Sequence, residues 1–290
     1  MQTTTGFALI SDARLRYIAT VFLMSYSGFA VAKVSSGAVE FAIGNVEFVL
    51  LHELAHVLIG DYDIPILGPE ELAADYFATA VLASDQRSDA ARAERARQTL
   101  LATANGLASA WEKRIEIGLE KPYWESHGLT IQRFYNIVCL TFGSNPEVFP
   151  RLPEQVGMPR ARADGCPAEF ARVERAVEWL RTTYGQPDKS EAGGTGMEIL
   201  FETPPTAASR QAVQTLKNSR ALEKTLQSLQ EKFVFKEPIQ IVFKSCRSAE
   251  AAWVPSSRQI VFCYRLLDAY VQLGQSRATS QRQKQLSTIR

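Results

Sequence analysis

The strongest constraint on this chain is a histidine pair inside one of its most apolar segments. Residues 41–59 are almost wholly apolar, yet the pattern HExxH runs through them from His52 to His56. The length and apolarity of the segment predict a buried helix. Imidazole and carboxylate groups are costly to bury in such a helix without a cation or full pairing of their polar atoms. The fold therefore has to accommodate a polar cluster, on or beside its core, that is either metal-bound or fully paired.

The spacing of this pattern assigns roles as well as residues. Residues four apart in a helix lie on one face, so His52 and His56 can offer two imidazole nitrogens to a single ion. Glu53 lies about 100° round the same turn, where it can reach a coordinated water without being a ligand. The chain has only three histidines, so this spacing is roughly a one-in-several-hundred coincidence of composition. The alternative is a core helix whose histidines bond to backbone carbonyls.

A third protein ligand is expected downstream, because a catalytic zinc takes three protein ligands and keeps one position open. Gly60 can end the first helix, and Pro69 suits the first turn of the next. Glu71 and Asp75 then lie four apart on one face. Glu71 can bind the metal while Asp75 holds the second nitrogen of a histidine, although Asp75 as the ligand itself is the competing assignment. The helix dipole alone explains Glu70.

HExxH followed by ExxxD on a second helix resembles the gluzincin arrangement of thermolysin-like metallopeptidases. The chain resembles more closely a bacterial domain-of-unknown-function family whose metallopeptidase label rests on this motif. The similarity extends over about residues 41–273. The segments that carry it are residues 41–45, 65–75, 127–136, Cys139, Cys166, Cys246, 253–255 and 263–264.

Two positions depart from the pattern of that family. Glu250-Ala251 stands where an Asn-Ala pair is usual, and Arg265 stands where a glutamate often follows the Cys-Tyr pair. These departures put in doubt any role carried over to the C-terminal segment, but they leave the metal ligands untouched. The resemblance implies a zinc-binding helical domain. It also implies that the sheet that gluzincins place before the zinc helix comes after it in this chain.

His127, the third histidine, lies outside the zinc pair. In gluzincin-type chemistry a further group stabilises the oxyanion opposite the metal, and His127, Arg133 or Tyr135 can supply it. Equally, His127 can cap the helix that is expected to begin near Gly128. The sequence does not choose between these roles.

Length and charge narrow the range of partners. The chain has 290 residues, of which 46% are hydrophobic, and this is enough for one sizeable core or two modest ones. Its net charge is +1, and no nucleic-acid-binding motif is present. A nucleic-acid partner is therefore not expected, and a peptide or protein substrate is.

Residues 1–32 resemble a secretory signal peptide. Arg14 and Arg16 precede a mostly apolar run, residues 17–29, and residues 30–32 supply a small-x-small cleavage pattern. The run is too short to span a bilayer comfortably. We therefore expect export to the periplasm or the medium and no stable membrane span in the mature chain. The alternative is a mature N-terminal helix that packs on the core.

The four cysteines agree with export, because an even number suits a disulfide framework. Pairing in sequence order, Cys139 with Cys166 and Cys246 with Cys263, is the simplest of three connectivities. Buried free thiols in a cytosolic protein are the alternative. A cysteine zinc site is not expected, because the chain has no CxxC pair.

The remaining periodicity predicts an α+β, mostly helical fold with a zincin-like metal domain and a small C-terminal sheet portion. Further helices are expected at residues 88–118, 125–142, 168–184 and 206–233, with a last short helix, and strands at 197–202, 239–243 and 259–264. The expected organisation is a helical zinc domain at 33–184, a possible linker at 185–196, an α/β portion packed on the first at 197–273 and a disordered tail at 274–290.

Together these features predict a zinc-dependent peptidase. Zinc bound by His52, His56 and Glu71 activates a water, Glu53 takes its proton, and the resulting hydroxide attacks a carbonyl carbon. The competing class is a catalytically inactive, zinc-stabilised binding or scaffold protein of the same fold.

Overall fold

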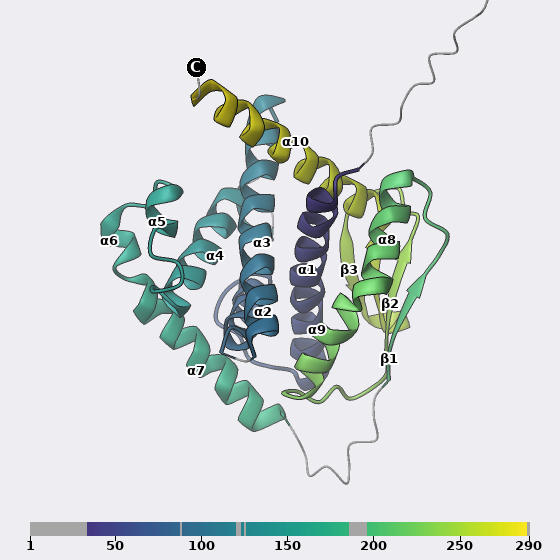
Figure 1. Cartoon of the computed structure of the whole chain (residues 1–290). Coiled ribbons are helices and arrows are strands. Elements are labelled where there is room, and N and C mark those ends of the chain that lie inside the picture. The colour runs from purple at the N-terminus through teal and green to yellow at the C-terminus, as the bar shows by residue number, and fades with distance from the viewer. Residues whose placement is uncertain (1–33, 88, 120–122, 125, 186–195, 289–290) are drawn as a thin grey trace, which may run out of the picture. The chain divides into compact units, whose positions relative to one another are not determined.

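The computed structural model describes residues 34–87, 89–119, 123–124, 126–185 and 196–288. Helices dominate this part of the chain, and a four-stranded mixed sheet lies near the C-terminus (Figure 1), which confirms the predicted fold class. The predicted signal peptide and nearly all of the predicted linker lie outside the described residues. The predicted domain division stays a prediction.

The elements follow one another from helices to a mixed α/β region. The bounds are α1 (Ser36–Tyr62), α2 (Glu70–Asp85), α3 (Ala90–Glu116), α4 (Thr130–Ser144), α5 (Leu152–Gln155), α6 (Arg160–Ala163), α7 (Cys166–Tyr184), β1 (Met197–Phe201), α8 (Ala207–Ser219), α9 (Ala221–Gln230), β2 (Ile239–Lys244), β3 (Ala251–Val254), the 3₁₀ turn η1 (Pro255–Ser257), β4 (Gln259–Cys263) and α10 (Tyr264–Thr288).

Helix α1 is the centre of the packing. Ser35 caps its start by accepting a hydrogen bond from the Ala38 amide, and Asp63, at φ 49°, ends it in the left-handed conformation. The helix therefore continues past Gly60, where the sequence predicted its end. It contacts α2, α3, α8, α9, α10, β3 and β4. Because α1 is apolar on all sides, neighbours cover it all round.

The same apolarity makes α1 resemble a membrane span. It is the one described helix that is long and apolar enough to cross a bilayer, but 83% of its most apolar window is buried inside the protein. Close packing explains part of this burial. A Cβ atom at Gly44 would lie 2.9 Å from the Ala102 Cβ atom of α3, so glycine lets α1 and α3 approach each other.

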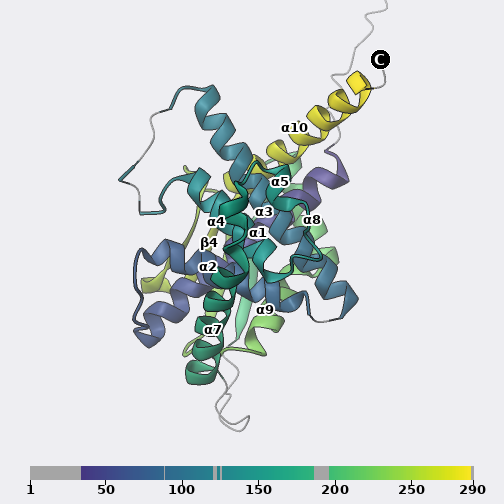
Figure 2. The same ribbon diagram turned by 90° about the vertical axis from the view of Figure 1, so that its left-hand side faces the viewer.

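Helices α2, α4 and α7 pack together on the side of α1 away from the sheet (Figure 2). The disulfide Cys139–Cys166 links α4 to the start of α7. A second disulfide, Cys246–Cys263, links the loop after β2 to the end of β4. Both bonds pair in sequence order, which confirms that prediction, and the structure holds no free cysteine.

The sheet has the strand order β1-β2-β4-β3. Strands β1, β2 and β4 are parallel, and β3 pairs with β4 in antiparallel register at the edge. Aromatic side chains stabilise one face of the parallel strands. The Phe243 ring stacks on both Phe201 and Phe262 at centroid distances of 4.8 Å.

Besides the later end of α1, four further differences from the predicted elements matter for the fold. The predicted helix 206–233 is two helices, because Arg220 takes a left-handed conformation at φ 52°. Helix α4 begins at Thr130 rather than at residue 125. Strand β3 was not predicted.

The fourth difference concerns the C-terminal segment. The sequence predicted a disordered tail from residue 274, but helix α10 continues to Thr288. Two contacts anchor the middle of this helix. A Cβ atom at Gly274 would lie 2.9 Å from the Ala38 Cα atom of α1, and Arg277 donates to Asn105 and Ser109 of α3 at 2.6 and 3.2 Å. The composition of the segment does not reveal these tertiary contacts.

Candidate metal centre

The HExxH histidines and Glu71 meet where the C-terminal half of α1 faces the start of α2. The Nε2 atoms of His52 and His56 are 3.2 Å apart. Glu71 Oε2 lies 3.1 Å from the first of these nitrogens and 3.7 Å from the second. Among the described residues these three side chains form a group that can hold a metal ion, with their ligand atoms within 4.8 Å of one another.

This donor set fits zinc in both chemistry and size. Two imidazole nitrogens with one carboxylate oxygen are a known catalytic zinc set. Zinc–ligand bonds of about 2.0–2.1 Å in a tetrahedral site separate neighbouring ligand atoms by about 3.3 Å. The observed separations of 3.1, 3.2 and 3.7 Å lie around that value. The group can therefore accept zinc without a change of backbone.

Asp75 holds the second nitrogen of His52. Its Oδ1 atom lies 3.0 Å from His52 Nδ1, and its carboxylate accepts two hydrogen bonds from Arg133, of 2.7 and 2.8 Å. Asp75 is 1% exposed, so its oxygens are committed to these partners. A carboxylate behind a ligand histidine fixes the tautomer and the orientation of its ring. The contacts support the predicted division of roles, with Glu71 as ligand and Asp75 behind it.

His56 has an equivalent support that the sequence analysis missed. Glu70 Oε1 lies 2.6 Å from His56 Nδ1, whereas the sequence assigned Glu70 to the helix dipole alone. The sequence did contain a signal for this contact. Each ligand histidine needs a partner for its second nitrogen, and Glu70 is the carboxylate next to the proposed ligand Glu71.

Glu53 lies beside the three-residue group without belonging to it. It is 7% exposed, and its Oε2 atom accepts a hydrogen bond of 2.8 Å from the backbone N–H of Trp253 in β3. This bond joins the middle of the HExxH helix to the edge strand of the sheet. The family resemblance had pointed to the segment around Trp253 and Pro255, but the periodicity of this segment did not predict a strand.

His127 reaches the same group from the loop before α4. Its Nε2 atom lies 3.0 Å from Glu71 Oε2, and 55% of its side chain is exposed. Helix α4 has Leu129 as its N-cap and no side-chain cap hydrogen bond. The structure therefore does not support the helix-capping alternative for His127.

Two other residues were proposed to stabilise the oxyanion. Only Arg133 lies near the metal group, where it donates hydrogen bonds to Asp75. The Tyr135 side chain is directed elsewhere. Its hydroxyl donates to the Val156 carbonyl at 3.3 Å, and its ring packs against Phe134 at a centroid distance of 4.9 Å. Because this bond occupies its hydroxyl away from the metal ligands, the structure does not bring Tyr135 into the site.

Charge around the metal group favours cations. Burial lowers the pKa of His52, but hydrogen bonds to the carboxylates of Asp75 and Glu71 outweigh burial and raise the pKa to about 9. The pKa of His56 is raised for the same kind of reason, despite burial, by Glu71 and Glu70. Burial would raise the pKa of Glu71, yet its three histidine partners hold that pKa far below its usual value. The group thus combines a carboxylate whose pKa is lowered with two imidazoles whose pKa values are raised.

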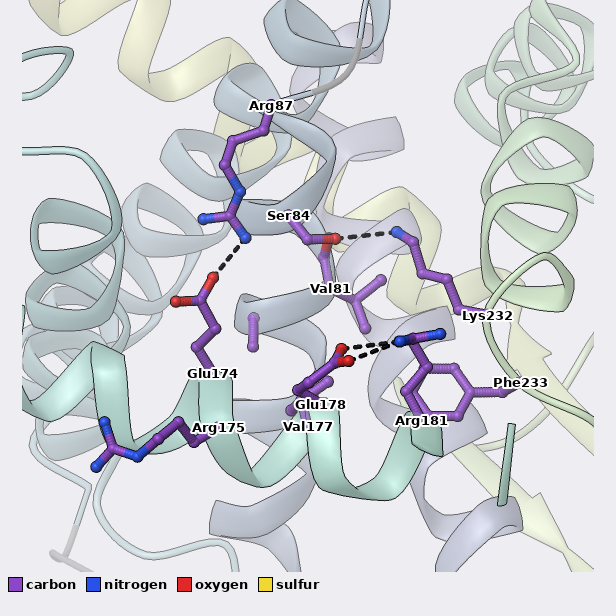
Figure 3. A pocket seen from close by; sticks show the side chains of 11 residues that line it. Val81, Ser84, Arg87, Glu174, Arg175, Val177, Glu178, Arg181, Lys232 and Phe233 are labelled. Atoms are coloured by element: carbon purple, nitrogen blue, oxygen red, sulfur yellow. Dashed lines mark hydrogen bonds and ion pairs between the residues drawn. The ribbon is translucent and has the colours of Figure 1, made fainter. Parts of the chain in front are cut away.

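Two cavities lie elsewhere on the described part of the chain. One, of about 500 Å³, opens between α2 and α7, and the other, of about 440 Å³, lies among α1, α2, α3 and α9. None of the three candidate metal ligands, His52, His56 and Glu71, lines either cavity. Figure 3 shows two ion pairs at the first cavity, Arg87 with Glu174 and Arg181 with Glu178.

Comparison with known families gives one match. The model of the family DUF4344, described as "Putative metallopeptidase", matches residues 21–181 and 201–290. The matched range includes all three candidate metal ligands, Glu53 and β3. Searches of curated proteins and of solved structures found no match.

Proposed function

The chain belongs to this metallopeptidase family, and from that premise we propose that it is a zinc-dependent peptidase of the gluzincin type. The observation that carries the proposal is the convergence of His52, His56 and Glu71, with Glu53 adjacent on α1. A zinc-stabilised protein with no activity needs the three ligands. It does not need a carboxylate held beside them in the position of a general base.

Bound zinc would supply a Lewis acid and lower the pKa of a coordinated water to about 7. The protein's own side chains hold the ligands in place. Asp75 and Glu70 bind the Nδ1 atoms of the two histidines, so that both Nε2 atoms face Glu71. Arg133 in turn fixes Asp75. Each histidine thus has one carboxylate behind it, and only one of these carboxylates is buried.

Glu53 is the proposed general base. It takes the proton of the attacking water and returns a proton to the leaving amine. The Trp253 N–H donates to one oxygen of Glu53, which orients the carboxylate. His127 contacts the same Oε2 atom of Glu71 as the two HExxH histidines, and it is the proposed donor to the developing oxyanion.

Strand β3 offers a site for an extended peptide. Among the described residues it pairs with β4 on one side, and on the other side its Trp253 amide faces Glu53 of α1. An extended peptide can add to such an edge through main-chain hydrogen bonds. The proposed substrate is therefore an extended segment of a peptide or protein, and no nucleic acid is expected as a partner. The proposed location is outside the cytoplasm, in line with the two disulfides.

The test is turnover of a peptide library by zinc-loaded protein. Glu53→Gln should keep stoichiometric zinc and lose about 10²- to 10⁴-fold in rate, because it removes the base and spares the ligands. Glu154→Gln, which makes the same change at an exposed position of α5, is the matched control and should keep full activity. Equal rates for wild type and Glu53→Gln would exclude the mechanism. A wild type that binds zinc and cleaves nothing would support the scaffold alternative.

A further inference from the structure

The cavity of about 440 Å³ among α1, α2, α3 and α9 has the size and the lining of a ligand site. Small-molecule sites typically occupy about 300–1,000 Å³ and are lined mainly by apolar side chains, with a few polar groups among them. Buried apolar side chains from all four helices line this cavity: Leu51 of α1, Val81 and Leu82 of α2, Ala96 of α3 and Ala221 of α9.

The acidic side chains of the lining are withdrawn from solvent and already paired. Glu47 is 2% exposed and accepts hydrogen bonds from Arg95 and Thr99 at 3.0 and 2.8 Å. The Asp85 side chain is 15% exposed and pairs with Lys232 at 2.6 Å. Because both carboxylates have these partners, the cavity does not need a cationic ligand to balance their charge.

The basic side chains of the lining lie nearer to solvent. Lys224 of α9 is exposed, and no other residue in the described part of the chain forms an ion pair with it. The Arg92 side chain of α3 is 40% exposed and pairs with Glu231 at 3.3 Å. Lys224 is therefore a charged group at the cavity that is available to an anion.

Arg95 adds a hydrogen-bond donor to the wall of the cavity. Its Nη2 atom is buried and has no hydrogen-bond acceptor among the described residues, although Glu47 Oε2 lies 2.5 Å away in a poor hydrogen-bond geometry. A buried donor without an acceptor costs free energy. An acceptor oxygen of a ligand would relieve that cost.

We propose that this cavity binds a small carboxylate that has an apolar body. The apolar part packs on the buried side chains, and the carboxylate faces Lys224. Three basic and two acidic side chains line the cavity, for a net charge of +1, and both acidic ones are paired inside it. Charge and lining together thus favour an anionic amphiphile. A fatty acid and a short peptide with an apolar C-terminal residue share this chemistry. The site does not depend on the proposed peptidase function.

Calorimetric titration of the zinc-loaded protein at low salt tests the proposal. The probes are octanoate and N-acetyl-leucylleucine, each compared with a neutral counterpart, octanol or the peptide amide. Octylamine is the cationic control. At least one carboxylate should bind about tenfold more tightly than its neutral counterpart, as expected for a hydrogen bond to a charged group. Octylamine should bind no better than octanol.

Two variants locate the binding site. Ala91 is an exposed residue of α3 at the cavity, so Ala91→Phe should fill the opening and weaken binding at least about tenfold. Ala110→Phe, at an exposed position of α3 outside the cavity, should have no effect. Lys224→Gln should weaken carboxylate binding by about fivefold and leave octanol unchanged. Lys113→Gln, at an exposed position near the end of α3, is its control. All four positions are exposed, so melting temperatures without ligand should match the wild type.

The pattern of binding decides the proposal and the source of the ligand. Weaker binding in Ala91→Phe and Lys224→Gln, and in neither control, supports the site. Binding of octanoate alone identifies an acyl chain as the ligand class, and binding of the dipeptide alone identifies a peptide C-terminus. The proposal is overturned if neither carboxylate binds, or if the neutral counterparts bind equally well. Carboxylate binding that both variants leave unaltered, as expected for coordination to zinc, would overturn it too.

Discussion

At the scale of single residues, the two carboxylates nearest to His52 differ in what else they bind. Glu71 has three histidine nitrogens around Oε2, at 3.0, 3.1 and 3.7 Å. The oxygens of Asp75 instead accept two hydrogen bonds from Arg133 and face His52 Nδ1. A ligand oxygen has to face the same point as both Nε2 atoms, and only Glu71 does so. Helical spacing alone left both assignments open.

Zinc content tests this difference. Glu71→Ala should lose stoichiometric zinc and lower the melting temperature, because the ion joins α1 to α2. Asp75→Asn keeps the shape of a side chain behind His52, so zinc should remain bound with an affinity about 10- to 100-fold lower. Elemental analysis after dialysis and a competition titration give both quantities. The reverse pattern, with zinc lost in Asp75→Asn and kept in Glu71→Ala, would exchange the two roles.

His127 has a testable role of its own. If its ring donates to the oxyanion, His127→Ala should lower kcat by about 10²-fold, equivalent to about 2.7 kcal/mol, with zinc content unchanged. The melting temperature should stay the same, since α4 has no side-chain cap to lose. Turnover per mole of bound zinc is the measurement. Equal values for wild type and His127→Ala would remove His127 from the mechanism and leave Arg133 as the nearest cation.

Protons compete with zinc at His52. Burial opposes the charge on this ring, but Asp75 and Glu71 hold its metal-free pKa at about 9, above the ordinary value of 6.5. At pH 7 the metal-free ring is therefore protonated, and it must lose that proton to bind zinc. Release of the His52 proton alone should make apparent zinc affinity rise with pH by up to about tenfold per unit, and this contribution should level off above pH 9. Calorimetry at pH 7 in buffers of different ionisation enthalpy should show proton release, and an absence of release would contradict the raised pKa.

The sequence predicted those site residues that helical spacing determines and missed those that tertiary packing determines. His52, His56, Glu71 and Asp75 follow from residues four apart on two helices. The contact between Glu53 and the Trp253 amide joins positions 200 residues apart. The periodicity of the sequence cannot predict such a contact, because the contact depends on how the sheet packs on α1.

At the scale of elements, long periodic segments predicted where the helices lie. Local backbone conformation and packing determine the residues at which each helix begins and ends. Helix α1 passes Gly60 because its C-cap is Asp63, which has a left-handed backbone. Strand β3 escaped prediction because it is four residues long and lies at the sheet edge. The separation of α8 from α9 depends on the left-handed conformation of one residue, Arg220. An arginine does not predict this conformation, because its residue type does not favour it.

That residue supplies a prediction about stability. Arg220 takes φ 52° and ψ 37° between α8 and α9, a conformation that glycine adopts without the steric cost borne by other residues. Arg220→Gly should therefore raise the free energy of unfolding by about 0.5 kcal/mol. Arg172→Gly, at an exposed position inside α7, should instead lower it by about 1 kcal/mol. Urea unfolding of both variants gives the sign of each change in the free energy of unfolding. A lower stability of Arg220→Gly would mean that the conformation of Arg220 does not cause the break between α8 and α9.

At the scale of the whole molecule, both the helical and the sheet-bearing parts of the described chain pack on α1. The metal group lies where α2 meets this helix, and the general-base candidate lies where β3 meets it. Loss of zinc should therefore loosen the contact between α1 and α2. The two disulfides lie outside this junction, between α4 and α7 and at the end of the sheet. They stabilise the two parts that pack on α1.

The disulfides also bear on where the protein works. Disulfides persist in oxidising compartments and are rare in the cytosol, so the chain should carry a leader that exports it. The pattern at residues 30–32, which lies outside the described residues, predicts cleavage after Ala32. Protein from its natural host should then start at Lys33 and show no titratable thiol until it is unfolded and reduced. Intact mass and thiol counting before and after reduction test both halves together. Retention of residues 1–32 with four free thiols would refute export. A cleaved chain with free thiols would place the protein outside the cytosol and show that oxidation is not needed for its fold.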